Sequence, residues 1–140
     1  EPTNLGMPVN SDGEEVHPTI AENGNVYFFG RDNITLDIYF AKYENGHYLE
    51  PEKVGNEINS EFFELDPIIA SDESYLIFQS NRNGGFGKMD LYISFKDKEN
   101  NKWTDAINMG KIINTESAET TGKLSLDKKY FSLTKETSEI

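Results

Sequence analysis

Two histidines and a large excess of carboxylates are the side chains of this sequence that could support acid–base or metal chemistry. The 140 residues include 25 Asp and Glu, 13 Lys and Arg, and no Cys. Without Cys there can be no disulfide, thiolate zinc site or cysteine nucleophile. A catalytic triad or a two-histidine metal site would need His17 and His47 to converge with Asp or Ser partners, and no spacing indicates this. We therefore predict no catalytic residue, no metal site and no cofactor.

The charge excludes several classes of partner. The formal net charge is −12, and no basic stretch is long enough to follow a phosphate backbone. Nucleic acid is therefore not an expected partner, and anionic membrane surfaces are disfavoured for the same reason. No run approaches the roughly 20 apolar residues that a membrane span requires, so no membrane insertion is expected.

The elements that would position these side chains follow from an internal repeat. A segment with Gly, then an apolar residue, Asn and a hydroxyl residue occurs three times, with 49 residues from Gly6 to Gly55 and 55 from Gly55 to Gly110. Asn10, Asn59 and Asn114 keep the same separations. A period of about fifty residues is typical of propeller blades and other repeat architectures.

Each repeat contains a recurring set of predicted strands. An aromatic second strand is expected at residues 26–29, 75–78 and 130–133, and in the first copy Asn23-Gly24 suits a two-residue turn with positive φ at both positions. A third strand begins at Asp37 and Asp90, and Tyr48 or Trp103 opens the last one. Four strands per repeat predict an all-β fold made of four-stranded antiparallel β-propeller blades.

The repeat also sets expected boundaries within residues 1–140. We expect the outer strand and linker of a preceding blade at 1–14, one blade at 15–60, a second at 61–115 and half a blade at 116–140. A closed propeller needs typically four to eight blades. Either a longer parent polypeptide or another copy of the chain is therefore expected to supply the remaining blades.

These features resemble the TolB-like, WD-type β-propeller repeat. The resemblance is carried by Asp66-Pro67 before an inner strand, the Arg-Asn-Gly-Gly loop at residues 82–85, the third-strand start at 89–92, and Trp103. It covers nearly the whole chain and implies a six-bladed parent, exported or periplasmic in bacteria. It also implies a non-catalytic binding or scaffolding module for a protein, peptide or cell-envelope component. The alternatives are the propeller portion of a larger hydrolase or polysaccharide lyase, and a purely structural linker.

Polar residues that recur in every unit are expected to serve the unit itself, whereas a catalytic group is needed only once. We expect the repeated Glu to accept hydrogen bonds from backbone N–H groups of the adjoining turn. The Asp at the third strand is expected to bond the strand start, with metal ligation as the alternative. The repeated Arg is expected to pair with that Asp or with a neighbouring blade, and Tyr48 and Trp103 to pack between blades. The repeated charged residues are Glu15, Glu64, Glu119, Asp37, Asp90, Arg31 and Arg82.

Overall fold

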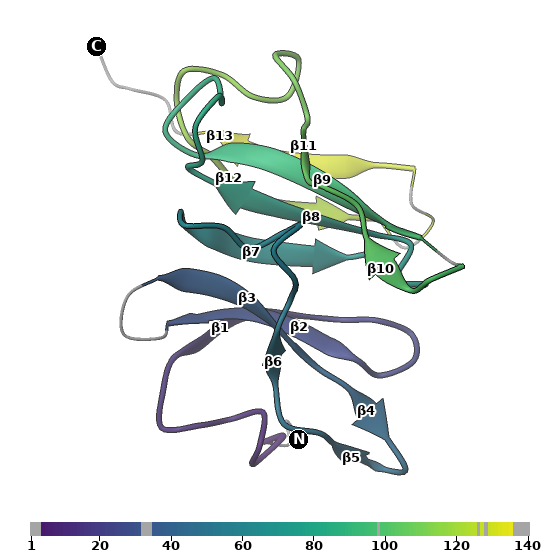
Figure 1. Ribbon diagram of the computed structural model, residues 1–140. Helices are drawn as coiled ribbons and strands as arrows, with labels where there is room; N and C mark the ends of the chain where they lie inside the picture. The colour runs from purple at the N-terminus through teal and green to yellow at the C-terminus, as the bar shows by residue number, and fades with distance from the viewer. Residues whose placement is uncertain (1–3, 32–34, 98, 126, 128, 136–140) are drawn as a thin grey trace.

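The structure is a computed structural model that describes residues 4–31, 35–97, 99–125, 127 and 129–135. Every regular element in these ranges is a β-strand, so the chain is all-β, as the sequence predicted (Figure 1). The same residues contain no helix long and apolar enough to cross a membrane.

The strands form antiparallel sheets in chain order. The first sheet has the order β1-β2-β3-β6. In the sequence, a short hairpin of β4 and β5 comes between β3 and β6. The bounds are β1 (Glu15–Ile20), β2 (Val26–Arg31), β3 (Leu36–Ala41), β4 (Tyr43–Glu44), β5 (His47–Tyr48) and β6 (Glu52–Lys53).

The second sheet repeats this design, and the third contains its first half. The second has the order β10-β9-β8-β7, with β11 also paired to β9, whereas the third consists of β12 and β13. The bounds are β7 (Glu64–Ile69), β8 (Tyr75–Ser80), β9 (Asp90–Asp97), β10 (Lys102–Trp103), β11 (Ile107–Asn108), β12 (Glu119–Leu124) and β13 (Phe131–Lys135).

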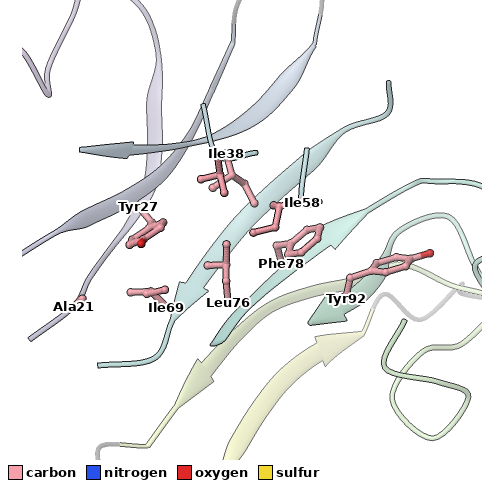
Figure 2. Packing of buried hydrophobic residues seen from close by; sticks show 9 residues of the cluster. Ala21, Tyr27, Ile38, Ile58, Ile69, Leu76, Phe78 and Tyr92 are labelled. Carbon is pink, nitrogen blue, oxygen red and sulfur yellow. The ribbon is translucent and has the colours of Figure 1, made fainter. Parts of the chain in front are cut away.

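The main core lies between the first and second sheets, which face one another (Figure 1). Burying a large apolar side chain contributes roughly 1.5–3 kcal/mol, so this boundary is a principal source of stability. On the faces that meet at this boundary, the two sheets share one apolar cluster. Figure 2 shows eight labelled members of the cluster: Ala21, Tyr27 and Ile38 from the first repeat, Ile58 from the connection, and Ile69, Leu76, Phe78 and Tyr92 from the second.

The first hairpin differs from the predicted two-residue turn. Ile20 pairs with Val26, so residues 21–25 form a longer loop, and in it Gly24 has a positive φ of 89° whereas Asn23 does not. The N–H of Gly24 donates to the carbonyl of Ala21 at 3.0 Å. The prediction of positive φ at both positions is therefore wrong, because the loop is a tight turn followed by one left-handed residue.

The segment before the first sheet also differs from prediction. We expected an outer strand before Asn10, but residues 4–14 form turns and bends rather than a strand. A strand needs a neighbouring strand to satisfy its backbone groups, and in the described chain none pairs with this segment. Val9 is nevertheless 4% exposed and packs on Val26, Phe28 and Ala41, on the face of the first sheet that points away from the second.

Candidate functional site

A cavity of about 580 Å³ opens where the first strands of the three sheets lie beside one another. Its walls come from equivalent parts of the three repeats, namely residues 17–20 of β1, 66–69 of β7 and 122–124 of β12. The strands are consecutive in space as well as in the repeat, since β1 contacts β7 and β7 contacts β12. We take this cavity as the candidate site because equivalent strands of three repeats contribute to it.

Each of these strands has a register shift at the cavity. The shift lies between Val16 and Thr19 in β1, and recurs at residues 65–68 in β7 and 120–123 in β12. His17 and Asp66 occupy equivalent positions within the shifts, and both have a φ of 48°. Such irregularities turn a side chain away from the regular alternation of a strand. The repeat therefore presents one such side chain to the cavity from each of β1 and β7, namely His17 and Asp66.

His17 and Asp66 contact one another at the cavity wall. The His17 Nδ1 atom is hydrogen-bonded to Asp66 Oδ1, and Gln79 Nε2 donates to Asp66 Oδ2 at 2.6 Å. The side chain of His17 is 54% exposed, whereas that of Asp66 is 12% exposed. The carboxylate orients the imidazole through Nδ1, so the remaining ring nitrogen, Nε2, is the one available to a ligand.

The sequence did not reveal this pair. Residue spacing indicated no convergence of the two histidines with Asp or Ser partners, and the structure brings only His17 together with an Asp. The two residues meet because equivalent positions of stacked neighbouring sheets lie side by side, and their shared repeat position was the signal that could have found them. His47 lies in β5, away from the residues that line the cavity.

The repeated Glu residues bond to the turn that precedes their own strand. Glu64 accepts from Ser60 N–H at 2.9 Å and from Ser60 Oγ at 2.7 Å. Glu119 accepts from Thr115 N–H at 3.0 Å, and Glu15 accepts from the hydroxyl of Ser11. All three carboxylates therefore fasten the start of a first strand to the residue that follows the repeated Asn.

Arg82 has partners other than the expected Asp90. It donates through Nη2 to Glu64 Oε1 at 2.9 Å and to the carbonyl of Ile58, in the segment that arrives from the first sheet. Its guanidinium also lies 4.9 Å from the ring centroid of Tyr92. The expected pairing with Asp90 is therefore wrong, because the buried Glu64 provides the nearer negative charge, whereas the bond to Ile58 agrees with the alternative, a contact with the neighbouring repeat. The side chain of Arg31 lies outside the described residues.

The two Asp residues of the third strands are engaged within the protein. Asp90 accepts from the N–H groups of Phe86 and Gly87 at 2.6 and 3.0 Å, as expected of a residue that bonds the strand start. Asp37 forms an ion pair with Lys53 at 2.8 Å. No group of three or more potential ligands that could hold a metal ion occurs in the part of the chain that the structure describes.

The side chains of Asn59 and Asn114 join their turns to the third strand of the preceding sheet. Asn59 accepts from Ile38 N–H and donates to Ile38 O, both at 2.9 Å. Asn114 makes the same pair of bonds with Leu91, at 2.8 and 3.0 Å. Asn10 instead donates to Asn4 at 2.8 Å. The backbone N–H of each Asn donates to the carbonyl of the repeated Gly, namely Gly6, Gly55 and Gly110.

The two aromatic residues before the outer strands pack in different clusters. Trp103 lies against the core between the first two sheets, with its ring centroid 6.3 Å from that of Tyr27. Tyr48 packs against the smaller cluster on the outward face of the first sheet. Both are engaged by apolar neighbours rather than presented to the cavity.

Comparison with known proteins adds no assignment to this geometry. No protein-family model matches the chain, and no curated protein matches it significantly.

Proposed function

We propose that this chain is a set of TolB-like β-propeller blades that acts as a non-catalytic binding or scaffolding module of an exported, periplasmic protein. Its partner is a protein, a peptide or a cell-envelope component, bound where the first strands line the cavity. The remaining blades are supplied by a longer polypeptide or by another copy of the chain. The blade assignment is supported by two antiparallel sheets of the same strand order, stacked through a shared core.

The observation that carries the binding role is the cavity with its His17–Asp66 pair. A cavity of about 580 Å³ is large enough for a few side chains of a partner. It combines the apolar side chains of Ile68 and Ile69 with a small number of oriented polar groups, the composition expected of a recognition site.

The recurring polar residues support a role without catalysis. Glu64, Arg82 and Asn59 are held in bonds between strands and turns. The bond of Glu64 to its turn recurs at Glu119, and the bonds of Asn59 to the third strand recur at Asn114. In the cavity, Asp66 is bonded to His17 and to Gln79. The available chemistry is therefore hydrogen bonding and apolar contact at one open surface.

The test is a selection of displayed peptides against the immobilised chain, followed by calorimetric titration of the enriched peptides. We expect His17→Ala and Asp66→Asn to weaken binding by about tenfold, corresponding to loss of one oriented polar contact. His47→Ala is the matched control, because His47 is exposed in the β4–β5 hairpin, and it should leave affinity unchanged. Equal affinities for the two histidine variants, or cleavage of the enriched peptides, would contradict the proposal.

A further inference from the structure

Asn is followed by Gly at three places in the sequence, Asn23-Gly24, Asn45-Gly46 and Asn83-Gly84. In such a pair the backbone nitrogen of Gly can attack the side-chain amide carbon of Asn, because Gly has no Cβ to hinder the approach. The new C–N bond closes a five-membered succinimide, and ammonia leaves as the amide C–N bond breaks. Water then opens the ring at either carbonyl, which gives aspartate or isoaspartate.

The local structure decides which of the three pairs can react. Attack requires the bond between Cα and the carbonyl carbon of Asn to rotate, so the side-chain amide and the backbone nitrogen must both be able to move. A pair that is held by hydrogen bonds, by close packing or by strand pairing reacts only when that part of the structure opens. The reacting groups are the same in the three pairs, and only these restraints differ.

The first pair is restrained at both reacting groups. The Gly24 N–H donates to a carbonyl of its own loop at 3.0 Å. The Asn23 amide accepts from the N–H of Asn25 at 3.0 Å and donates to Glu73 Oε2 at 3.1 Å. Gly24 also lies against Tyr43, whose ring would be 2.9 Å from a Cβ at this position. Contacts within the loop and with the second sheet therefore hold Asn23 away from attack.

The second pair is restrained by its backbone. Asn45 and Gly46 form the two-residue turn of the β4–β5 hairpin, with φ of 52° and 86°. Glu44 and His47, on either side of this turn, are paired with one another. Rotation of the Asn45 backbone therefore requires the hairpin to open.

The third pair lacks the restraints of the other two. Ser80 and Asp90 form the last pair of β8 with β9, so Asn83-Gly84 lies within a longer connection and not in a closed turn. Both residues are exposed, and within the described ranges neither the Asn83 side chain nor the Gly84 N–H has a hydrogen-bond partner. A Cβ at Gly84 would meet no other part of the protein within 4 Å.

We propose that Asn83 is a modification site, at which the folded chain loses the side-chain amide spontaneously to give aspartate or isoaspartate, whereas the fold protects Asn23 and Asn45. The proposal rests on the restraints at the three pairs and not on the binding role proposed for the cavity. Each conversion adds one carboxylate, and isoaspartate also adds one carbon to the main chain.

The connection is anchored on both sides of Asn83. Arg82 donates to Glu64 on one side, and the Gly87 N–H donates to Asp90 on the other. The added charge and the longer main chain therefore fall between two fixed points. We expect the change to be confined to the connection, with the bonds of both sheets retained.

Peptide mapping by mass spectrometry measures the three conversions in one sample, since each replaces ammonia by water. The complete chain is incubated at mildly alkaline pH, folded and in guanidinium, and the rate at each Asn in the folded chain is divided by its rate in the unfolded chain. We expect a ratio near one for Asn83 and ratios lower by about tenfold or more for Asn23 and Asn45. A ratio for Asn83 no higher than the other two would overturn the proposal.

Glu73→Ala tests the protection of Asn23. The substitution removes the acceptor of the Asn23 amide, so the conversion of Asn23 should become severalfold faster while that of Asn45 stays the same. Asn45 is the internal control, because a general loosening of the fold would raise both rates. A rise at both sites, or at neither, would show that the contact with Glu73 does not protect Asn23.

Asn23→Asp and Asn83→Asp reproduce the two aspartate products in matched variants. Asn23→Asp places a second carboxylate beside Glu73, in place of an amide nitrogen that lies 3.1 Å from Oε2, so we expect a lower urea midpoint. Asn83→Asp should leave the midpoint unchanged. A lower midpoint for Asn83→Asp would show that the modification is not confined to the connection.

Discussion

The phenol of Tyr27 in the first sheet donates a hydrogen bond of 2.9 Å to Glu73, in a hairpin turn of the second sheet. Asn25 donates to the same carboxylate at 2.9 Å, and the Lys96 ammonium lies 3.4 Å from it. Glu73 has a φ of 54° and occupies the place that Gly24 has in the first hairpin. The boundary between the two sheets is therefore closed at one end by a polar contact beside its apolar core.

The free energy of unfolding should depend on pH through the ionisation of Glu73. Burial raises the pKa of Glu73, but hydrogen bonds from Asn25 and Tyr27 and the charge of Lys96 outweigh it, so the pKa lies below its ordinary value of 4.5. The unfolded chain therefore takes up this proton at a higher pH than the folded chain. The stability that Glu73 contributes is complete above 4.5 and is lost as the pH falls through the lowered folded-state pKa.

Urea denaturation of wild type and Glu73→Gln at a series of acidic pH values measures this contribution. We expect the variant to be less stable at neutral pH by about 1–3 kcal/mol, since a buried charged acceptor is lost. The difference should shrink as the pH falls. Parallel pH profiles for the two proteins would show that Glu73 is not responsible.

The buried ion pair of Glu64 and Arg82 should be strongly coupled. Arg82→Ala leaves a fully buried carboxylate without its cation, which typically costs about 3–5 kcal/mol. Glu64→Ala should cost a similar amount, and the double variant should be clearly less destabilised than the sum. Lys42→Ala is the control, because Lys42 and Glu44 form an exposed pair at 2.8 Å and no measurable change is expected. Additive effects at Glu64 and Arg82 would exclude the coupling.

Asn59 should be required for the attachment of the turn to the first sheet. Its side chain is buried and bonds to both backbone groups of Ile38 and to the carbonyl of Val54. Asn59→Ala removes the partners of the Ile38 N–H and the Val54 carbonyl, whereas the Ile38 carbonyl keeps the N–H of Val54, so we expect a loss of about 2–4 kcal/mol in the free energy of unfolding. Asn56→Ala, at an exposed position of the same turn, should change stability little. Similar losses for both variants would indicate a general effect of the turn.

The connection between β8 and β9 should tolerate no side chain at Gly87. A Cβ there would lie 2.1 Å from the carbonyl oxygen of Ser117 and 2.3 Å from that of Thr115. We predict that Gly87→Ala destabilises by about 1–3 kcal/mol. Faster amide exchange should appear at Lys88 and Glu119, whose N–H groups donate across this contact.

Gly13→Ala is the matched control for Gly87→Ala. A Cβ at Gly13 would meet two ends of flexible side chains, the Ser11 hydroxyl at 3.1 Å and Glu15 Oε1 at 3.8 Å, and these can adjust. A Gly87→Ala variant as stable as Gly13→Ala would show that the connection is not packed against the third sheet.

Local patterns in the sequence predicted the strands well. The apolar run at residues 75–78 corresponds to β8 (Tyr75–Ser80), and the run at 26–29 to β2 (Val26–Arg31). Continuous apolar runs are typical of strands that are buried on both faces, and they can be recognised from adjacent residues alone. The strand expected before Asn10 did not form, because a strand also depends on a partner that local sequence does not reveal.

Contacts between repeats could not be predicted in the same way. His17 and Asp66 are 49 residues apart, and only the stacking of two sheets brings their side chains together. Arg82 was expected to pair with Asp90 or with a neighbouring blade, and it pairs with Glu64 on the first strand of its sheet and with the carbonyl of Ile58 from the preceding repeat. Both contacts depend on how strands align across a sheet or between sheets, which residue spacing alone does not specify.

The shared core between the first two sheets has a consequence for how the chain folds. Tyr27 and Ile38 from one repeat share a buried cluster with Leu76 and Phe78 from the next, so an isolated repeat would expose part of these side chains to water. Cooperative folding therefore requires adjacent repeats to form together. We expect a pair of adjacent repeats to be the smallest part of this protein that folds on its own, and the two members of the pair to unfold together.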